Sequence, residues 1–554
     1  MSKPRLKIIP LGGLSEIGKN MMVMEYENDI IIIDAGLMFP GEEMLGIDLV
    51  IPDISYLLEN KDKIRGIVIT HGHEDHVGAL PYLLPQLNVP VYSTRLTNGL
   101  ISVKLKERKA LAGAKLKVIQ FGSQISLGKF RVEFFPVCHS IPDAAGLIIS
   151  TPIGTIIHSG DFKLDYTPVD GKPTDLSRLA QLGIQGVLLL LADSTYAELP
   201  GYTPSERVVG ETLDRVIANA AGRVIVTTFS SLVSRIQQVI DAAAKHQRRV
   251  FIIGRSMTDI VRMTMELGYL KAPDGVLGRI DELKGMPRNR VVLITTGSQG
   301  EPTSALVRIA NRDHRQVHII RGDTVVLSAT AVPGNEALIN RTVDNLFKQG
   351  AQVLYDKVAP VHVHGHGSQE ELKLLLNLVK PRFFLPIHGE YRHLSLHAKL
   401  AQSLGIPKGN TFLLEDGDIL ELSPQGGRKT GKVSSGNVYV DGLSVGDIGS
   451  VVLRDRRMLS RDGVVMVIIT VNRQTGKLVG RPDIISRGFI EPGEAKDKEM
   501  IDKSRDMVAR ALDHSGVRPA EWGFIYRKVR DILNKFYYDQ TKRHPMILPV
   551  MVKV

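Results

Sequence analysis

Six consecutive residues in the first quarter of the chain could hold metal ions: His71-Gly72-His73-Glu74-Asp75-His76. Imidazole nitrogen and carboxylate oxygen are ligands that Zn²⁺ and Mn²⁺ accept, and two such ions about 3.5–4 Å apart can clamp both oxygens of a phosphoryl displacement. A strand-like run, Gly66 to Thr70, precedes these residues. At a strand-to-helix turn the first two histidines face one side, and Asp75 and His76 the other. The alternative to a metal site is a surface loop that is rich in histidine by chance. Four ligand-type residues directly after one buried strand favour two facing sets of metal ligands instead.

The composition describes a globular protein of several domains. The chain has 554 residues, of which 43% are hydrophobic and 23% charged, and roughly two to four domains are expected at this length. Lys and Arg number 70 against 59 Asp and Glu, a net charge of +11, which suits a polyanionic partner without proving one. The single cysteine, Cys138, excludes an intramolecular disulfide and fits a reducing compartment. With neither a signal peptide nor a membrane-spanning stretch in view, we expect a cytoplasmic protein without membrane contact.

The rhythm of the sequence indicates an α/β protein with an inserted domain. Residues 1–204 and 358–425 contain short β-branched strands that end in polar residues, and we expect them to form one domain in two pieces. Residues 205–357 alternate strands and helices, which predicts a doubly wound parallel sheet. Residues 426–448 begin with a polar, Gly-rich stretch and are expected to be a linker. Residues 449–554 are expected to form a small α+β domain.

Individual elements follow from the same patterns. The strand candidates of the inserted domain are Arg223 to Thr228, Val250 to Gly254, Val291 to Thr296 and Thr324 to Ser328. In the last domain, Val451 to Leu453 and Val464 to Asn472 form an alternating block, and helices are expected at about Ala495 to His514 and Glu521 to Thr541.

The His-rich loop resembles the first motif of the metallo-β-lactamase superfamily, whose fold is an αββα sandwich. The resemblance implies further ligands in chain order: His139 after the strand Arg131 to Val137, Asp161 in His158-Ser159-Gly160-Asp161, and His388 in a late strand end. One metal would then take His71, His73 and His139, and the other Asp75, His76 and His388, with Asp161 between them. The implied cofactors are two Zn²⁺ per subunit, with Mn²⁺ or Mg²⁺ as alternative ions that support activity.

Four residues near these ligands are expected to have structural or supporting roles and not to bind metal. His158 lies within a buried-looking strand and is expected to be a hydrogen-bonded core histidine. Cys138 points away from His139 by strand alternation, toward the core. Glu74 is expected to be solvated or to support a ligand from behind. Asp34 is expected to orient a ligand histidine rather than to bind metal.

A long interruption separates Asp161 from His388. Compact superfamily members that act on lactams or thioesters lack such an insertion, whereas this chain resembles the β-CASP nucleases. Asp193, in Ala192-Asp193-Ser194-Thr195, and His366 match two of their motifs, and His388 is the third. The resemblance implies metal-assisted phosphodiester hydrolysis. In it Asp75 orients the nucleophile or accepts its proton, His366 binds the scissile phosphate, and Asp193 supports the site from behind.

The chain resembles the ribonuclease J family almost from end to end. The resembling segments include Pro10-Leu11-Gly12-Gly13, Gly365-His366-Gly367-Ser368, Pro386-Ile387-His388-Gly389-Glu390-Tyr391-Arg392 and Ser486-Arg487-Gly488-Phe489. The C-terminal domain separates this family from other β-CASP nucleases. The resemblance implies a zinc-dependent ribonuclease with 5′-3′ exonuclease and endonuclease activity, in RNA maturation, including rRNA processing, and in mRNA decay. The alternative is a metal-poor, weakly active assembly partner in an RNA-degradation complex.

Two loops are expected to bind a 5′-monophosphate next to the metals. They are Phe229-Ser230-Ser231 and the segment His362-Val363-His364-Gly365-His366-Gly367-Ser368. Both offer hydroxyl, imidazole and backbone N–H donors. A phosphate held there would place the first phosphodiester at the metals and release mononucleotides. Ser230 as an ordinary helix N-cap is the alternative. The chain departs from the family here, with Ser231-Leu232 in place of Ser-Asn and His364 in place of Ser.

The expected partners follow from the same resemblance. The preferred substrate is single-stranded RNA with a 5′-monophosphate. The C-terminal domain carries more apolar residues than its own core needs, so we expect it to pair subunits into a homodimer or homotetramer. Packing only on its own chain is the alternative. Other RNA-degradation proteins are further implied partners.

Overall fold

The computed structural model describes residues 5–301, 303–331, 335–475, 477–490, 495–513 and 522–554. The chain divides into two compact units, one of residues 1–39 and 50–438 and the other of residues 40–49 and 439–554. Among the described residues, no helix combines the length and the apolar character that crossing a membrane requires.

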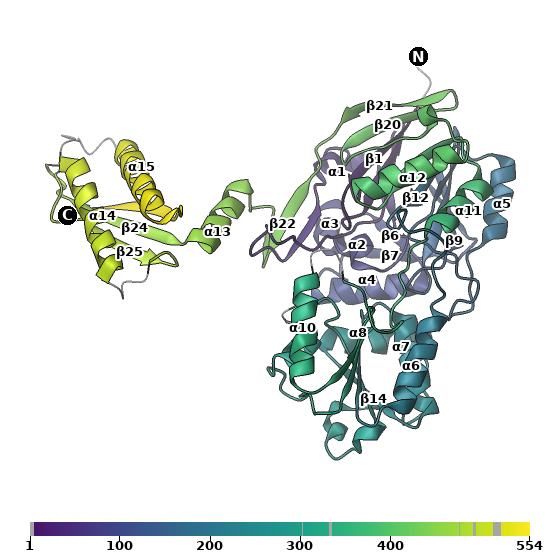
Figure 1. The fold of residues 1–554 in the computed structure, drawn as a ribbon. Helices are drawn as coiled ribbons and strands as arrows, with labels where there is room; N and C mark the ends of the chain where they lie inside the picture. The colour runs from purple at the N-terminus through teal and green to yellow at the C-terminus, as the bar shows by residue number, and fades with distance from the viewer. Residues whose placement is uncertain (1–4, 302, 332–334, 476, 491–494, 514–521) are drawn as a thin grey trace. The chain divides into compact units, whose positions relative to one another are not determined.

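Two sheets pack face to face in the larger unit (Figure 1). The first sheet has the order β21-β20-β1-β2-β3-β5-β6-β7. Its strands are β1 (Leu6–Gly12), β2 (Met21–Tyr26), β3 (Asp29–Ile33), β5 (Ile64–Val68), β6 (Pro90–Ser93), β7 (Lys115–Val118), β20 (Asp418–Ser423) and β21 (Gly426–Lys432). The short strand β4 (Leu49–Pro52) lies apart from this sheet.

The second sheet has the order β19-β12-β11-β10-β9-β8. Its strands are β8 (Gln124–Leu127), β9 (Phe130–Pro136), β10 (Ala145–Thr151), β11 (Gly154–His158), β12 (Leu189–Asp193) and β19 (Phe383–Ile387). A single buried core between the sheets contains Leu6 and Ile31 of the first and Phe134, Leu189 and Phe383 of the second. Non-directional burial of this apolar surface holds the two layers together.

Helices accompany both sheets of the sandwich. They are α1 (Ser55–Glu59), α2 (Glu74–Val77), α3 (Leu80–Leu87), α4 (Arg95–Glu107), α5 (Leu176–Gln185), α11 (Gln369–Val379) and α12 (Tyr391–Ser403). α5 and α11 pack on each other, and α12 packs on β19. The αββα sandwich expected from the sequence is confirmed.

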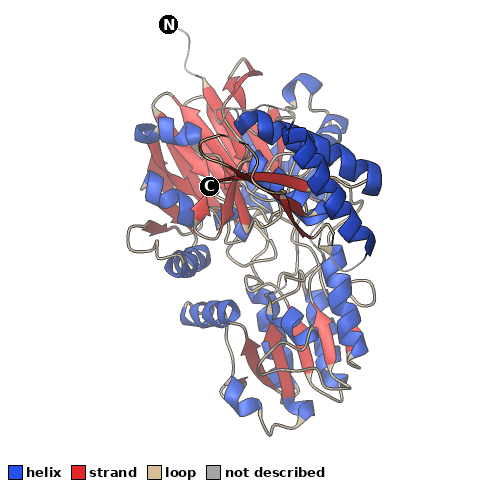
Figure 2. Ribbon diagram, turned by 90° about the vertical axis from the view of Figure 1, so that its left-hand side faces the viewer, coloured by secondary structure: helices blue, strands red, loops and turns tan. Residues whose placement is uncertain are grey.

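The inserted domain is built on a sheet with helices around it (Figure 2). The strands are parallel and have the order β15-β14-β16-β13-β17-β18. Its strands are β13 (Val224–Thr227), β14 (Arg249–Ile253), β15 (Leu277–Gly278), β16 (Val291–Thr295), β17 (Thr324–Leu327) and β18 (Gln352–Leu354). Its helices are α6 (Arg207–Asn219), α7 (Val233–Lys245), α8 (Arg255–Glu266), α9 (Ala305–Ala310) and α10 (Glu336–Lys348). The doubly wound domain and its four strand candidates are confirmed, while the domain bounds at 204 and 357 stay a prediction.

The smaller unit has a three-stranded sheet of order β25-β24-β26. Its elements are the hairpin strands β22 (Asn437–Asp441) and β23 (Ser444–Val445), α13 (Ser450–Asp462), β24 (Val464–Val471), β25 (Asp483–Arg487), α14 (Ala495–Asp513), α15 (Trp522–Thr541) and β26 (Met546–Lys553). The two expected helices are confirmed within the described residues. His514 and Glu521, at their predicted ends, lie outside them.

Two expectations were wrong. The predicted linker begins with β21, which pairs antiparallel with β20. An edge strand facing solvent needs no apolar residues, so its Gly- and Lys-rich composition resembles that of a linker. Val451 to Leu453 lie within α13 rather than in a strand. Three residues are too few to distinguish a strand period from a helical one.

Candidate metal centre

The site lies where several strands of the sandwich end. β11, β12 and β19 are parallel neighbours, so their carboxyl ends meet at one edge. Asp161 follows β11, Asp193 ends β12 and His388 follows β19. The loop after β5 and the short helix α2 bring the His-rich motif, and the loop after β9 brings His139. All seven predicted metal ligands therefore fall into two groups of converging ligand atoms, His71, His73 and His139 in one and Asp75, His76, Asp161 and His388 in the other.

The first group consists of three imidazoles. Nδ1 of His73 lies 3.0 Å from Nε2 of His71 and 3.1 Å from Nε2 of His139. A tetrahedral zinc site with Zn–N bonds of about 2.0–2.1 Å has edges of about 3.3 Å, so these spacings fit such a site. His139 donates its Nδ1–H to the carbonyl of Gly365 at 2.7 Å, which leaves Nε2 free for a ligand bond. A side chain at Gly365 would collide with this imidazole.

The second group combines carboxylates and imidazoles. Asp161 Oδ2 lies 3.2 Å from His76 Nε2, and Asp161 Oδ1 lies 3.0 Å from His388 Nδ1. Asp75 Oδ2 is 3.4 Å from both His76 Nε2 and His388 Nε2. Asp161 Oδ2 also reaches to 3.8 Å from His71 Nε2 in the first group. One carboxylate thus faces both groups, as a bridging ligand must.

Electrostatics also favours a cation here. Burial lowers the pKa of His71 and His139 well below the ordinary value, and that of His73 to about 4, so these imidazoles are neutral and able to bind metal. Burial opposes charge on His76 and His388, yet Asp161 and its neighbours raise the pKa of both. Nε2 of His388 is buried without a hydrogen bond. The nitrogen and oxygen donors fit a divalent metal ion.

The structure shows how the four neighbouring residues are held. Asp34 accepts from His76 Nδ1 at 2.8 Å and from the Thr70 backbone N–H at 2.8 Å, so it orients a ligand histidine. His158 is buried and accepts from the Gly160 N–H at 3.0 Å. Cys138 is buried. Glu74 is half exposed and pairs with Lys104.

His366 and Asp193 adjoin the metal groups. His366 donates its Nδ1–H to Asp193 Oδ2 at 2.7 Å, and both lie within one further cluster with Asp161 and His388. Burial opposes a charge on His366, but Asp193 raises its pKa. The pair therefore places an imidazole, held in one orientation, beside the groups that converge on the metals.

The two loops that are predicted to bind phosphate make different contacts with the rest of the protein. Phe229, Ser230 and Ser231 are half buried, and α7 starts from Leu232 without a side-chain cap, so Ser230 is not the N-cap. Val363 is buried in the core. His364 stacks on Tyr196 with ring centroids 3.9 Å apart. Three buried polar atoms in or next to these loops make no hydrogen bond: Nδ1 of His362 and the hydroxyls of Thr227 and Thr228.

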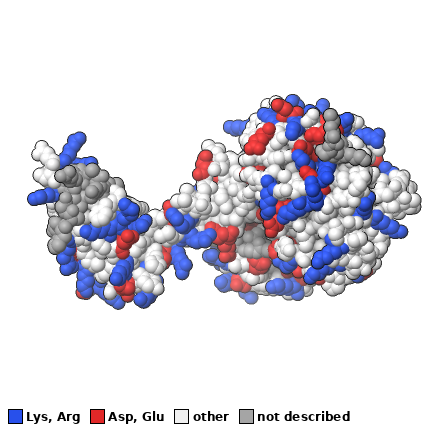
Figure 3. All heavy atoms as spheres, turned by 90° about the horizontal axis from the view of Figure 1, so that it is seen from above, with Lys and Arg blue, Asp and Glu red and all other residues white. Residues whose placement is uncertain are grey.

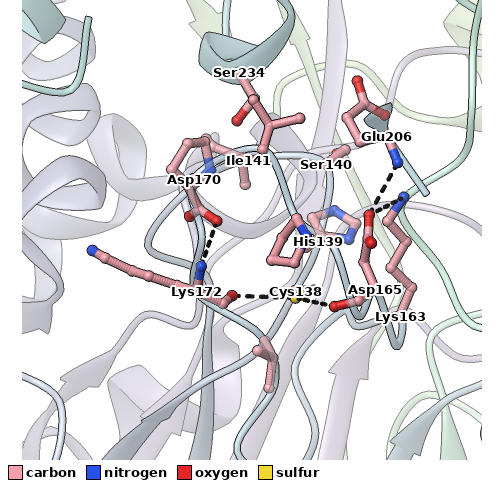
Figure 4. Close-up of a pocket in the computed structure, with 14 residues that line it drawn as sticks. Cys138, His139, Ser140, Ile141, Lys163, Asp165, Asp170, Lys172, Glu206 and Ser234 are labelled. Carbon is pink, nitrogen blue, oxygen red and sulfur yellow. Dashed lines mark hydrogen bonds and ion pairs between the residues drawn. The ribbon is translucent and has the colours of Figure 1, made fainter. Parts of the chain in front are cut away.

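Ser368 is the most constrained residue of these loops. It is buried at the N-cap of α11, and its hydroxyl lies 3.0 Å from that of Thr203. A hollow beside His139 opens near these loops and is lined by residues of both the sandwich and the inserted domain (Figure 4). Within it Asp165 accepts from the Glu206 N–H at 3.0 Å and lies 3.9 Å from Lys163 Nζ.

Sequence reasoning missed two residues that touch the site. The Asn20 amide nitrogen lies 3.3 Å from Asp75 Oδ2 and 3.2 Å from His76 Nε2. The Thr195 hydroxyl lies 3.3 Å from His388 Nδ1 and donates to the His388 carbonyl at 3.2 Å. Asn20 precedes a wholly buried strand, and Thr195 follows another. A polar residue at such a junction is the available signal, but it does not identify the partner.

Comparison with known families agrees with this geometry. Residues 15–211 match the metallo-β-lactamase superfamily, and residues 221–346 match the ribonuclease J beta-CASP domain. Residues 352–409 match the Zn-dependent metallo-hydrolase RNA specificity domain, and residues 451–554 match the ribonuclease J C-terminal domain. Fold and site together define a metal-dependent hydrolase of the metallo-β-lactamase superfamily that carries a β-CASP domain.

Relatives align with nearly the whole chain. Ribonuclease J2 of Bacillus subtilis is 45% identical over 551 residues, which is 99% of each chain. Ribonuclease J of Thermus thermophilus is 47% identical over 559 residues, which is 99% of this chain and 95% of the relative. The chain belongs to the ribonuclease J family. A solved structure of a protein of unknown function from Enterococcus faecalis V583 covers 76% of this chain and 100% of its own, with a TM-score of 0.54 and 17% identity, and shares the fold.

The chain is therefore a ribonuclease J-like, metal-dependent nuclease that binds RNA. The alternative of a metal-poor assembly partner is not favoured, because all seven expected ligands converge. The face in Figure 3 shows Lys and Arg mixed with Asp and Glu on the larger unit. Residues 451–554 hold 21 Lys and Arg against 13 Asp and Glu, so most of the positive surplus lies there.

Proposed function

We propose that the protein hydrolyses RNA phosphodiester bonds with two zinc ions per subunit. His71, His73 and His139 would hold one ion, and Asp75, His76 and His388 the other, with Asp161 shared. The observation that carries this proposal is the position of Asp161, whose carboxylate faces both groups. When bound, two divalent ions supply a nucleophile at neutral pH and neutralise charge on the phosphoryl oxygens.

The side chains around the ions have different roles in the reaction. Asp75 orients the attacking water or accepts its proton, and Asn20 holds the Asp75 carboxylate in place. His366, whose pKa the Asp193 carboxylate raises, would donate its other N–H to the scissile phosphate, which would stabilise charge in the transition state. Asp193 fixes the orientation of the His366 imidazole, which is a positioning role.

We propose further that a 5′-monophosphate binds one nucleotide beyond the metals, which gives 5′-3′ exonuclease activity besides endonuclease activity. Ser230 and Ser231 support this, because neither caps α7. The buried, unpaired Nδ1 of His362 supports it as well, because such a group costs free energy unless a partner arrives. The Ser368 hydroxyl is hydrogen-bonded to that of Thr203. Ser368 would therefore hold the segment His362 to Ser368 in place rather than bind the phosphate through its own hydroxyl.

Two RNAs of one sequence, with 5′-monophosphate or 5′-triphosphate, test this pocket. We expect mononucleotide release from the monophosphate RNA only, and a loss of this preference in Ser231→Ala. Equal exonuclease rates on both RNAs would refute the pocket. Metal content and hydrolysis of an internally labelled circular RNA test the metal centre independently, because a circle has no 5′ end.

We also propose that the C-terminal domain pairs subunits into a dimer or tetramer. One face of its sheet is buried, whereas the other carries Val464, Met466, Ile468, Leu548, Val550, Val552 and Ile485. On this outer face Ile485, Val550 and Val552 are 39%, 39% and 41% exposed. Apolar side chains of neighbouring strands that face solvent together mark an interaction surface.

Sedimentation of the full chain tests the pairing. Val550→Glu should shift the protein toward the monomer, because it places a charge within the apolar face. Ile184→Glu is the control, since Ile184 is 88% exposed on the larger unit. An unchanged oligomer in Val550→Glu would refute this surface.

We also propose that the protein is cytoplasmic and that it associates with other RNA-degradation proteins.

A further inference from the structure

Glu371 is a fully buried carboxylate held by backbone N–H groups. Its side chain has no ion-pair partner among the described residues and is 0% exposed. Oε1 accepts from the Leu164 N–H at 2.7 Å, and Oε2 accepts from the N–H groups of Thr203 at 2.7 Å and Ser368 at 2.8 Å. Charge-assisted bonds of this kind are short and strong, and they satisfy a carboxylate that would otherwise be costly to bury.

Each of these three N–H groups belongs to a segment that carries part of the site. Leu164 lies three residues after Asp161. Thr203 lies in the connection from β12 to the inserted domain, and its hydroxyl donates to the His366 carbonyl at 2.9 Å. Ser368 lies two residues after His366. Glu371 thus ties together the segments that hold the shared carboxylate and the phosphate-binding imidazole.

Helix capping explains only a part of this arrangement. Glu371 is the third residue of α11 and forms a capping box with Ser368, a local contact that stabilises a helix start. The bonds to Leu164 and Thr203 join residues 207 and 168 positions away in the chain. A glutamate that served the helix alone would need neither of them.

We propose that Glu371 is a positioning residue that sets the place of His366 relative to Asp161 and Asp193. It acts through two routes: the Ser368 N–H fixes the loop after His366, and the Thr203 N–H fixes the hydroxyl that holds the His366 carbonyl. The proposal rests on the proposed role of His366 at the scissile phosphate. It assigns to Glu371 no contact with substrate or metal.

Glu371→Gln tests this role with nearly unchanged shape. A glutamine presents one acceptor oxygen and an NH₂ group, so at least one of the three backbone N–H groups loses its acceptor and faces a donor. The loop of His366 must then move. A displacement of about 1 Å at a group that acts in the transition state costs about 100-fold in rate. We therefore expect kcat on 5′-monophosphorylated RNA to fall about 100-fold, with KM changed less than about 3-fold.

Glu370→Gln is the matched control. Glu370 is the adjacent residue of the same helix, is more exposed, and pairs with Lys373 at 2.7 Å on the surface. This variant should keep the wild-type kcat, because it removes the same charge without touching the loop. Thr203→Val is the second probe. It removes the hydroxyl bond to His366 and keeps the N–H bond to Glu371, so we expect a smaller loss, about 10-fold.

Three readouts separate the outcomes. Zinc content should stay at the wild-type value in both variants, and the histidine ¹³Cε1 resonance of His366, assigned with His366→Gln, should shift in both. Wild-type kcat or an unmoved resonance in folded Glu371→Gln would overturn the proposal, and so would loss of zinc. If Glu371→Gln does not fold, Thr203→Val decides by the same criteria. Wild-type kcat in His366→Gln would refute the role of His366 itself, and the resonance would still test its placement.

Discussion

Because of Asp416, the free energy of unfolding of the larger unit should fall as the pH rises toward neutrality. Lys19 is almost fully buried, and its Nζ lies 3.0 Å from Glu16 Oε1 and 3.7 Å from Asp416 Oδ2. One ammonium thus faces two carboxylates. Burial, and then the Glu16 carboxylate, raise the pKa of Asp416 from 3.8 to about 7. In Asp416→Asn this group cannot titrate, and Lys19 keeps Glu16 as its partner.

The sign and the size follow from proton linkage. Between about pH 4 and pH 7 the folded protein keeps a proton on Asp416 that the unfolded chain releases, so the free energy of unfolding falls by up to about 1.4 kcal/mol per pH unit. The full difference is about 4 kcal/mol above pH 7. For a unit of roughly 430 residues, with an unfolding entropy of about 2.1 cal/mol/K per residue, this corresponds to a Tm difference of about 4 °C.

Calorimetry of the wild type and Asp416→Asn from about pH 5 to pH 8, in EDTA, measures this difference, because titrating groups that do not interact with Asp416 contribute equally to both proteins and cancel. The Tm of the variant minus that of the wild type should rise steadily across this range and level off near pH 8. Glu415→Gln is the control: Glu415 is 61% exposed in its side chain and pairs with Lys432, so its difference should stay flat. A flat difference for Asp416→Asn would refute the reasoning.

Three further variants test the site and its supports. Asp75→Ala should lose one metal ion per chain by elemental analysis and nearly all turnover, with an unchanged far-UV spectrum, because Asp75 lies in the short helix α2, beyond the end of strand β5. Asp34→Asn should weaken metal binding about 10- to 100-fold in calorimetric titration, since it disturbs the hydrogen bond that orients His76. Arg235→Met should cost about 3–5 kcal/mol in chemical unfolding, because it leaves buried Glu206 without its partner, and Arg235→Met with Glu206→Gln should recover part of that loss.

The metal ligands could be predicted because each one follows a strand. A short buried run ending in His, Asp or a His-rich loop marks the edge of a sheet, and parallel neighbours bring such ends together. The inserted domain could be predicted for a similar reason, since its strands are apolar and regularly spaced. The sequence did not specify the pairing of β21, because an edge strand is fixed by its neighbour β20 rather than by its own residues.

The hydrogen bonds that hold the site residues in place could mostly not be predicted from the sequence. Glu371 resembles any glutamate in a helical capping box, and its bonds to Leu164 and Thr203 exist only because three distant segments meet. Asn20 is likewise an ordinary polar residue until the fold brings it to Asp75. Ser368 was expected to bind phosphate by its position in a motif, whereas the structure shows that its hydroxyl is already engaged. Motifs identify chemistry, but hydrogen-bond partners across the chain depend on tertiary structure.

The end of β12 shows how one short segment can organise several histidines. Asp193 accepts from His366, the Ser194 hydroxyl lies 3.0 Å from His397 Nδ1, and the Thr195 hydroxyl donates to the His388 carbonyl. Consecutive residues at a strand end point in different directions, so one tripeptide can contact the proposed phosphate-binding imidazole, a buried imidazole of α12 and a predicted metal ligand. The end of β12 therefore contacts both His366 and His388. This arrangement explains why an acidic residue at this strand end belongs to the site although it need not bind metal.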